Sequence, residues 1–311
     1  MIANEYINPK NSLVLYELRE KLDFLLNLYN SNKLPKVLMI SGKKGSGKFT
    51  LVSHFLVNVF DQDNYDIKNN TILANSTFYK QYADEIFPNI IHLSGDNFKN
   101  IKVDDIRDLK STILKTTMSK KERFIILDDI ELFNHNSLNA LLKVIEEPSS
   151  NNHFILINNQ TKPLIKTINS RSLELKIILD QKTRIQIINS LIKKNDLKVR
   201  FNFDYLNLTP GNFLRFNKIC EENEININDN FLKNTQLLLN LYKKNKDLNL
   251  INMILLLTDI YFYNLREKNL KNIDKIVEDK DFVISNINKF LTYNLNQNSL
   301  LNAISNKLSN E

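Results

Sequence analysis

The stretch Ser41-Gly42-Lys43-Lys44-Gly45-Ser46-Gly47-Lys48 directly follows the apolar run Val37–Ile40 and holds three of the five glycines in this 311-residue chain. Glycine lets a backbone turn tightly and present consecutive N–H groups to an anion. The N-terminal end of the following helix and the charge of Lys48 attract the same anion. The pattern G-x-x-x-x-G-K therefore predicts a nucleotide-phosphate loop formed by Gly42, Gly45, Ser46, Gly47 and Lys48. A plain strand-to-helix turn is the alternative, but such a turn needs only one glycine.

One element of this motif is missing. The residue after the lysine is normally Ser or Thr, whose hydroxyl binds Mg²⁺ beside the phosphates, and here it is Phe49. Thr50 is a candidate nucleotide contact, but it lies about 100° further around the helix and is a poor substitute for the metal ligand. We expect ATP or ADP as the ligand, weak or absent binding of Mg²⁺, and weak or absent hydrolysis by the isolated chain.

The bulk composition sets further limits. The chain has a net charge of +7, which permits contact with nucleic acid, and its 42% apolar and 25% charged residues are ordinary for a globular protein. The single Cys220 excludes an internal disulfide or a cysteine-based zinc site, and the four histidines lack the spacing of metal ligands. We therefore expect no zinc and no other bound metal site.

Two segments bear on membranes and targeting. The N-terminus lacks the layout of a signal peptide, and the longest apolar stretch, residues 251–263, contains Asn252, Thr258 and Asp259. That stretch is expected to be too short and too polar to span a bilayer. These features predict a cytoplasmic protein without membrane contact.

The first 178 residues alternate short apolar runs with helical patterns. We expect strands at Val37–Ile40, Ile90–Leu93, Phe124–Leu127, Phe154–Ile157 and Leu173–Ile177, and helices near 48–60, 104–117, 136–147 and 163–168. Such alternation predicts an α/β domain with a parallel sheet flanked by helices, and near-continuous apolar strands fit a sheet covered on both faces. Residues 61–89 are less regular and are expected to form a loop-like insertion.

Beyond residue 178 the pattern is helical. Helices are expected over 181–194, 212–222, 231–244, 248–266, 281–295 and 299–308. In the segment 248–266, apolar residues recur at helical spacing. We therefore predict three domains: an α/β nucleotide-binding domain at 1–178, a small helical domain at 179–227 and an all-α C-terminal domain at 228–311.

A second polar cluster follows the apolar run Phe124–Leu127. Asp128 and Asp129 come directly after it, so their carboxylates are expected at the carboxyl edge of the sheet, where α/β folds bind ligands. In a phosphate-loop protein the first acid helps to hold Mg²⁺ and the second residue orients the attacking water. Asp129 is one methylene shorter than the glutamate usual in hydrolysing proteins, which again argues against efficient hydrolysis.

The run Asn139-Ala140-Leu141-Leu142-Lys143, followed by Glu146-Glu147-Pro148, resembles the clamp-loader branch of the AAA+ ATPases. Phe154–Asn159 is similar to the sensor-1 strand of that family, with Asn159 in the sensor position, and Ser170-Arg171-Ser172 is similar to its Ser-Arg-Cys motif. The resemblance covers residues 30–178 and extends through the helical segment to about 225. It implies an AAA+ P-loop domain, a helical lid and a C-terminal collar-type domain. The four-cysteine zinc module that the family often carries has no counterpart in 61–89.

The resemblance also implies roles for two arginines. Arg171 would be an arginine finger, reaching in trans into the ATP site of a neighbouring subunit, where such a residue is worth about 10³–10⁵ in turnover. Its planar, permanently charged guanidinium suits phosphate oxygens better than an ammonium does. Arg215, in Thr209–Arg215, is similar to the sensor-2 arginine that faces the nucleotide of its own subunit.

Two bacterial subunit types of this branch remain to be separated. Phe49 and Asp129 favour the delta-prime type of DNA polymerase III over the ATP-hydrolysing gamma/tau type, which is the alternative. The implied partners are other clamp-loader subunits, of the delta and gamma/tau types, the sliding clamp indirectly, and primer-template DNA within the complex. An unrelated P-loop kinase is a third alternative, but the sequence offers no acceptor-substrate site for it.

Overall fold

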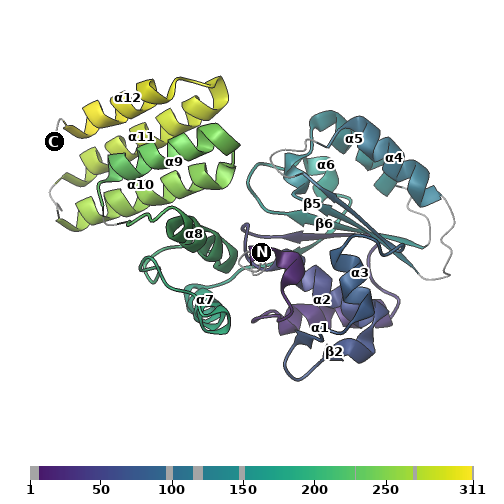
Figure 1. The fold of residues 1–311 in the computed structure, drawn as a ribbon. Coiled ribbons are helices and arrows are strands. Elements are labelled where there is room, and N and C mark those ends of the chain that lie inside the picture. The colour runs from purple at the N-terminus through teal and green to yellow at the C-terminus, as the bar shows by residue number, and fades with distance from the viewer. Residues whose placement is uncertain are drawn as a thin grey trace. The chain divides into compact units, whose positions relative to one another are not determined.

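The computed structural model describes residues 7–95, 101–114, 122–146, 151–227, 229–268 and 272–309. These residues form two compact units (Figure 1). The first unit extends to Leu197 and includes Leu206–Phe213, and the second takes Lys198–Tyr205 and the residues from Leu214 onward. Each unit is described separately below.

The first unit is built on a five-stranded parallel sheet with the strand order β4-β5-β6-β1-β7. The strands are β1 (Val37–Ser41), β4 (Ile90–Ser94), β5 (Arg123–Asp128), β6 (Asn152–Asn158) and β7 (Leu173–Lys176). All five predicted strands are therefore present, within one or two residues of their expected ends. β1 lies between β6 and β7, so the loop after β1 emerges where the order of the strands reverses, which is the usual ligand position in open α/β sheets.

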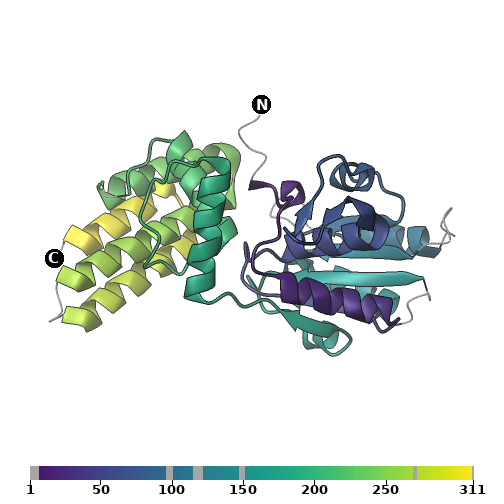
Figure 2. The same ribbon diagram turned by 90° about the horizontal axis from the view of Figure 1, so that it is seen from below.

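Alternate side chains of the strands enter two separate cores, because successive residues of a strand face opposite sides of a sheet. Leu38 and Ile40 pack with α1 (Arg19–Asn30), α2 (Lys48–Phe60) and α3 (Thr77–Ala83). On the other face, Val37 and Met39 pack with α4 (Val103–Leu114), α5 (His135–Ile145) and α6 (Lys166–Asn169). The two helical layers enclose the sheet in Figures 1 and 2. The predicted α/β fold class is confirmed.

The insertion between α2 and β4 is more ordered than its sequence suggests. It contains a short antiparallel pair, β2 (Tyr65–Asp66) with β3 (Thr71–Ile72), and the helix α3. Val14 of the N-terminal segment forms a further bridge to Thr71. The buried aromatic side chains Tyr65, Phe78, Tyr79 and Tyr82 belong to the same core as α2. Packing against α2 therefore orders this insertion.

A fully buried histidine connects α2 to this insertion. His54 Nδ1 lies 3.0 Å from the hydroxyl of Tyr65, and Nε2 lies 3.2 Å from the carbonyl oxygen of Ser12. Burial lowers the pKa of His54 to about 4, since an imidazolium would lose its hydration there. The side chain is therefore neutral at pH 7.

The first unit ends with α7 (Gln181–Asn195), and α8 (Pro210–Glu222) follows. The second unit continues with α9 (Phe231–Asn245), α10 (Leu248–Lys268), α11 (Ile273–Tyr293) and α12 (Gln297–Ser309). The helical character predicted for this region is confirmed, but α11 begins eight residues before the expected start at 281. Its first turns carry six charged residues among few apolar ones, so they show little amphipathic signal, and packing of Ile276 and Val283 decides their structure.

The expectation that the apolar segment near 251–263 is too short for a bilayer needs correction. It is part of a helix whose residues 248–267 are long and apolar enough to cross one, by length and composition alone, and half of the apolar window is buried within the protein. A core helix of a helical bundle meets the same criteria. In the same unit, Asp279 of α11 is completely buried and pairs with Lys307 of α12 at 2.8 Å.

We expect the stability of the first unit to fall as the pH drops from 6.5 to 4, because the unfolded chain then binds a proton at His54 that the native state excludes. The pKa of about 4 implies a loss of about 3 kcal/mol across this window. Urea unfolding of His54→Gln and the wild type, followed by circular dichroism between pH 7 and 4.5, measures it.

Asp128 acts in the opposite direction, since its pKa is raised to about 6 and its burial cost is relieved in acid. The difference between the two proteins removes this contribution, because both contain Asp128. The stability advantage of the wild type should shrink steadily as the pH falls. Parallel pH curves for the two proteins would contradict the assignment.

Candidate functional site

The predicted phosphate loop lies between β1 and α2, and close packing around it explains its glycines. Gly42 and Gly45 adopt φ values of 150° and 83°, which side-chain-bearing residues rarely adopt. A Cβ atom on Gly42 would lie 2.4 Å from the carbonyl oxygen of Ile177. Gly47, with φ 87°, is the N-cap of α2. The loop backbone is therefore fixed in one tight conformation.

The start of α8 braces this loop within the first unit. The Gly211 N–H donates to the carbonyl oxygen of Gly45 at 2.9 Å, and the Thr209 hydroxyl donates to that of Lys44 at 2.7 Å. A Cβ atom on Gly211 would approach the Cα of Gly45 to 2.7 Å. Glycine is therefore required at position 211 because the backbone there contacts a loop 166 positions earlier. The local sequence did not reveal this requirement.

Two polar groups of the loop are arranged to receive phosphate. Lys48 is 3% exposed, and its Nζ donates to the carbonyl oxygens of Gly42 and Lys43 at 2.7 and 2.9 Å. Burial lowers the pKa of Lys48 to about 8, against the opposing effect of the carboxylates of Asp128, Glu131 and Asp129. The buried hydroxyl of Ser46 finds no hydrogen-bond partner among the described residues. A phosphate oxygen would satisfy this hydroxyl, so the loop fits the predicted ligand.

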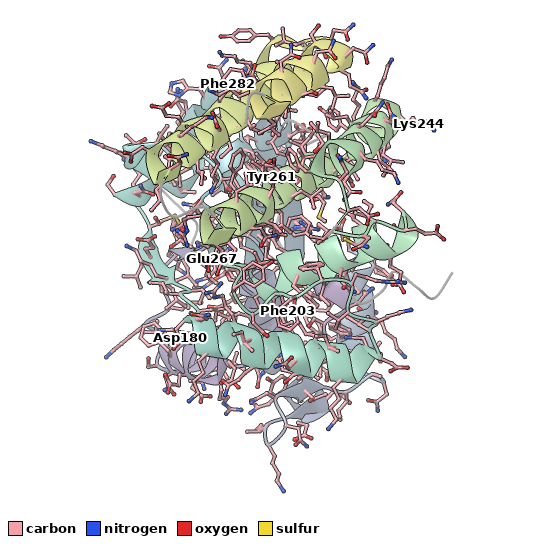
Figure 3. All side chains as sticks on the ribbon, turned by 90° about the vertical axis from the view of Figure 1, so that its left-hand side faces the viewer. Asp180, Phe203, Lys244, Tyr261, Glu267 and Phe282 are labelled. Atoms are coloured by element: carbon pink, nitrogen blue, oxygen red, sulfur yellow. The ribbon has the colours of Figure 1, made fainter. Side chains whose placement is uncertain are left out.

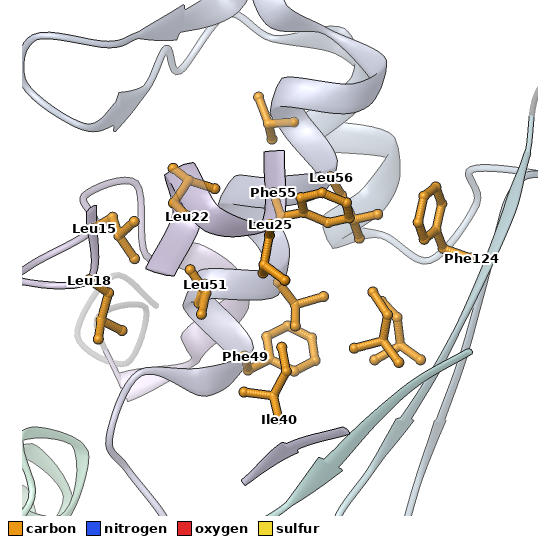
Figure 4. Packing of buried hydrophobic residues seen from close by; sticks show 14 of the residues in the cluster. Leu15, Leu18, Leu22, Leu25, Ile40, Phe49, Leu51, Phe55, Leu56 and Phe124 are labelled. Atoms are coloured by element: carbon orange, nitrogen blue, oxygen red, sulfur yellow. The ribbon is translucent and has the colours of Figure 1, made fainter. Parts of the chain in front are cut away.

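The side chain of Phe49 belongs to the core rather than to the loop. Its ring stacks on Tyr82 with centroids 6.5 Å apart and meets His92 edge-on at 5.4 Å. Figure 4 shows it beside Ile40, among the side chains under α2. Thr50, the other candidate on this turn, is almost fully buried. The first turn of α2 thus places an aromatic ring where related loops carry a metal-binding hydroxyl.

The two acids follow β5 as predicted. Asp129 adopts a left-handed conformation with φ 51°, and its N–H donates to the carboxylate of Asp128 at 2.8 Å. Burial and the neighbouring charge of Asp129 raise the pKa of Asp128 to about 6. The Asp128 carboxyl is therefore readily protonated in mild acid, which weakens it as a metal ligand there.

Asp129 is engaged by two neighbours. Lys44 of the phosphate loop approaches its two carboxylate oxygens at 3.1 and 3.2 Å, and the side-chain amide of Asn159 donates to Oδ1 at 2.7 Å. Asp129 itself is only 4% exposed. The structure thus brings the loop, the second acid and Asn159 together, and Lys44 supplies a positive charge beside this acid.

Glu131 is a site residue that sequence reasoning missed. It lies in the 3-10 turn η4 (Ile130–Leu132) and is 5% exposed. Its carboxylate accepts hydrogen bonds from the Asn159 N–H at 3.1 Å and from the Thr161 hydroxyl at 2.8 Å. Glu131 therefore fixes the loop after β6 that carries Asn159. The sequence Asp128-Asp129-Ile130-Glu131, with a third acid close to the other two, could have identified it as a site residue.

Arg171 lies after α6 and is partly exposed. Its guanidinium pairs with Glu146 at the end of α5 at 2.7 Å and donates to the carbonyl oxygen of Thr167 at 3.1 Å. Both side chains of the ion pair keep more than a third of their surface in water, 37% and 45%. Glu147 and Pro148 of the predicted motif lie outside the described residues.

Arg215 lies on α8 in the second unit, where its guanidinium donates to the side-chain oxygen of Asn249 at 3.2 Å. The predicted contact with a nucleotide is not tested by this arrangement and stays a prediction. Among the described residues, no group of three or more His, Cys, Asp or Glu side chains is placed to hold a metal ion.

The family described as "DNA polymerase III, delta subunit" matches residues 18–180, just over half of the chain. The chain belongs to this family. Its resemblance to the clamp-loader family is thereby confirmed, and the matched segment contains the phosphate loop, the acidic turn, Asn159 and Arg171.

Curated relatives agree at this coarser level. The chain is 26% identical to DNA polymerase III subunit gamma of Buchnera aphidicola (Schizaphis graminum) over 54% of this chain and 45% of that protein. It is 38% identical to subunit delta' of Pseudomonas aeruginosa over 24% and 23%, and 25% identical to that of Bacillus subtilis over 70% and 62%. The chain thus spans less than half the length of the first two.

A gamma-subunit-related protein of Thermotoga maritima is similar in structure, with a TM-score of 0.48 and 16% identity over 91% of this chain and 98% of that one.

We expect Phe49→Thr to destabilise the first unit by about 3 kcal/mol or more, because it removes a ring from a packed core and leaves a cavity with a buried hydroxyl. Phe49→Leu, which keeps most of the apolar volume, should cost clearly less. Urea unfolding of both variants decides this. Equal costs, or a negligible cost for the threonine variant, would show that the ring does not support the core.

Proposed function

We propose that this protein is a delta-prime-type subunit of the DNA polymerase III clamp loader, a cytoplasmic complex that places the sliding clamp on DNA during replication. In this role it binds ATP or ADP with little use of Mg²⁺ and turns it over slowly or not at all. It supplies Arg171 in trans to a neighbouring ATPase subunit of the gamma/tau type. Its further partners are a delta-type subunit, the sliding clamp indirectly and primer-template DNA within the complex.

One observation carries the proposal that the site binds a nucleotide without hydrolysing it: the carboxylate of Asp129 is held by Lys44 and Asn159. A carboxylate that orients attacking water must be available to that water. Here its charge is balanced by an ammonium of the same chain, and its Oδ1 oxygen already accepts hydrogen bonds. The packing of Phe49 in the core also removes the hydroxyl ligand that Mg²⁺ would use.

The groups that would bind phosphate, in contrast to Asp129, are in place. The constrained loop presents backbone N–H groups, Ser46 offers a buried hydroxyl, and Lys48 donates to two carbonyl oxygens of the loop. A phosphate would attract the Lys48 ammonium more strongly than these neutral oxygens do. When bound, a Mg²⁺ ion would polarise the phosphates, with Asp128 as its main carboxylate ligand.

The weak ion pair between Arg171 and Glu146 supports the proposed role of Arg171 in trans. A half-exposed ion pair such as that with Glu146 is worth only about 0–1 kcal/mol, so its exchange for a phosphate costs little. Bidentate arginine–phosphate contacts are among the stronger charge-assisted interactions. Glu146 therefore keeps the guanidinium ordered near the surface without binding it tightly.

A self-sufficient ATPase of the gamma/tau type is the second candidate. The complete set of phosphate-loop glycines with Lys48 favours it, and so does the 26% identity to a gamma subunit over 170 residues. The two candidate functions differ in whether Asp129 is available to orient the attacking water. They also differ in whether nucleotide binding depends on Mg²⁺.

We expect the purified chain to bind ADP with an affinity that changes by less than about threefold on addition of Mg²⁺. Lys44→Met should make binding more dependent on Mg²⁺, because it leaves Asp129 without its cation. Isothermal titration with and without Mg²⁺ measures both effects. Lys43→Met, which changes the exposed neighbour, is the matched control. A tenfold or larger requirement for Mg²⁺ in the wild type, or rapid ATP turnover, would favour the gamma/tau type.

In a complex reconstituted with its partner subunits, Arg171→Ala should lower DNA-stimulated ATP turnover by at least about 100-fold, while the nucleotide affinity of this chain stays unchanged. Arg107→Ala is the control, since Arg107 is also exposed and ion-paired, with Asp104 at 2.7 Å. Glu146→Gln should retain turnover. Normal turnover in the Arg171 variant would exclude the trans role without affecting the nucleotide-binding proposal.

A further inference from the structure

The second unit carries an uneven distribution of charge. Residues 230–246 contain four lysines, and residues 282–309 contain two, yet neither stretch has a single Asp or Glu. The whole chain, by contrast, has 42 basic and 35 acidic residues. These stretches include all of α9, the last part of α11 and all of α12, which are neighbours in the unit. The charge of the chain is thus concentrated on adjoining helices.

Two adjoining cavities lie on these helices and share Asn240. One, of about 340 Å³, contains Lys243 and Lys246 and is lined otherwise by amide and aromatic side chains and by Leu295. The other, of about 320 Å³, runs along the exposed face of α9 and contains Lys233 and Lys244. Among the described residues that line the two cavities, none is acidic. Figure 3 labels Lys244, near the end of α9.

The C-terminal ends of α9 and α11 at this groove are each capped by a backbone hydrogen bond. Lys246 and Asn294 end α9 and α11 in the left-handed conformation, and their N–H groups donate to the carbonyl oxygens of Tyr242 and Phe290. The first turn of α12 borders the larger cavity with Gln297 and Asn298, and the N-terminal end of a helix carries a partial positive charge.

Nearby carboxylates are occupied elsewhere. Asp247 follows Lys246, but its carboxylate accepts from the N–H and the side-chain amide of Asn249 at 2.9 and 2.7 Å. Asp279 is completely buried against Lys307. Neither Asp247 nor Asp279 therefore pairs with a lysine of the groove.

Aromatic rings accompany the lysines. Lys246 lies over the ring of Tyr242 at 5.3 Å, and Tyr242 meets Phe290 edge-on. Tyr293, one residue before Asn294, is 69% exposed. Lysines that track phosphates, amides that donate hydrogen bonds and exposed rings on which bases stack are the elements of sites for single-stranded nucleic acid.

We propose that this groove, formed by the ends of α9 and α11 and the start of α12, binds single-stranded nucleic acid through its phosphate backbone. The exposed ring of Tyr293 favours a single strand, whose unpaired bases can stack on it, over a duplex. An acidic peptide has the same charge, and the lining includes the apolar residues Leu237, Leu241 and Leu295 beside the lysine and amide groups, so peptide binding is one outcome of the test below. The inference is independent of the nucleotide site and of Arg171.

The test is the affinity of the full chain for a fluorescein-labelled oligothymidine, measured by anisotropy at several salt concentrations. A triple variant with Lys243, Lys244 and Lys246 changed to Gln should bind at least about tenfold more weakly at 0.1 M salt, and the slope of log K against log salt should fall by about 2. Tyr293→Ala should weaken binding of the strand without changing that slope.

A second triple variant, with Lys182, Lys193 and Lys194 of α7 changed to Gln, removes the same charge from another acid-free helix. It should keep the affinity within about twofold. Equal losses in both triple variants would mean that net charge alone drives binding, and the proposal would be wrong. Tighter binding of duplex than of single strand, or of an acidic peptide than of either, would overturn it as well. Far-ultraviolet circular dichroism verifies that each variant is folded.

Discussion

Parallel pairing of three neighbouring strands places the phosphate loop, the acidic turn and Asn159 at one edge of the sheet. Ser41 of β1 pairs with Asn158 of β6, and β6 pairs in turn with β5, whose last residue is Asp128. Because all strands run in the same direction, their carboxyl ends coincide, and three segments that are distant in the sequence converge. The hydrogen bonds from Asn159 and Lys44 to Asp129 follow from this register.

The consequence for chemistry is that charges are balanced within the protein. A buried carboxylate without a partner is costly, and removal of one member of a buried ion pair typically costs about 3–5 kcal/mol. Asp129 obtains its partner from Lys44, whose side chain stays 31% exposed, so the full cost applies chiefly to the acid. In a metal-dependent site the ion supplies this positive charge instead. Lys44 therefore stabilises the acidic turn and at the same time engages the carboxylate of Asp129.

Local patterns in the sequence predicted the strands, the phosphate loop and the positions of Asp128 and Asp129, because strand periodicity and glycine placement are decided within a few residues. The partners of those residues were beyond such patterns. Lys44 and Asp129 are 85 positions apart, and Glu131 bonds Asn159 across 28. Phe49 appeared as a missing hydroxyl, but only the packing of Tyr82 and His92 explains why a ring is placed there. The order within the insertion at 61–89 was missed for the same reason, because it comes from aromatic packing with α2.

Three cations of the candidate site differ in how easily they can leave their present partners. Lys44 faces a buried carboxylate, so its release is the most costly. Lys48 contacts neutral carbonyl oxygens and has a lowered pKa of about 8, so an arriving phosphate would both attract it and favour its charged form. Arg171 contacts a half-exposed carboxylate in water-screened surroundings. A nucleotide would therefore engage Lys48 first and leave Lys44 with Asp129, while Arg171 stays available to an anion on another molecule. This order follows from the burial and the charge of each partner, and it is the order that the proposed site, which holds phosphate without activating water, requires.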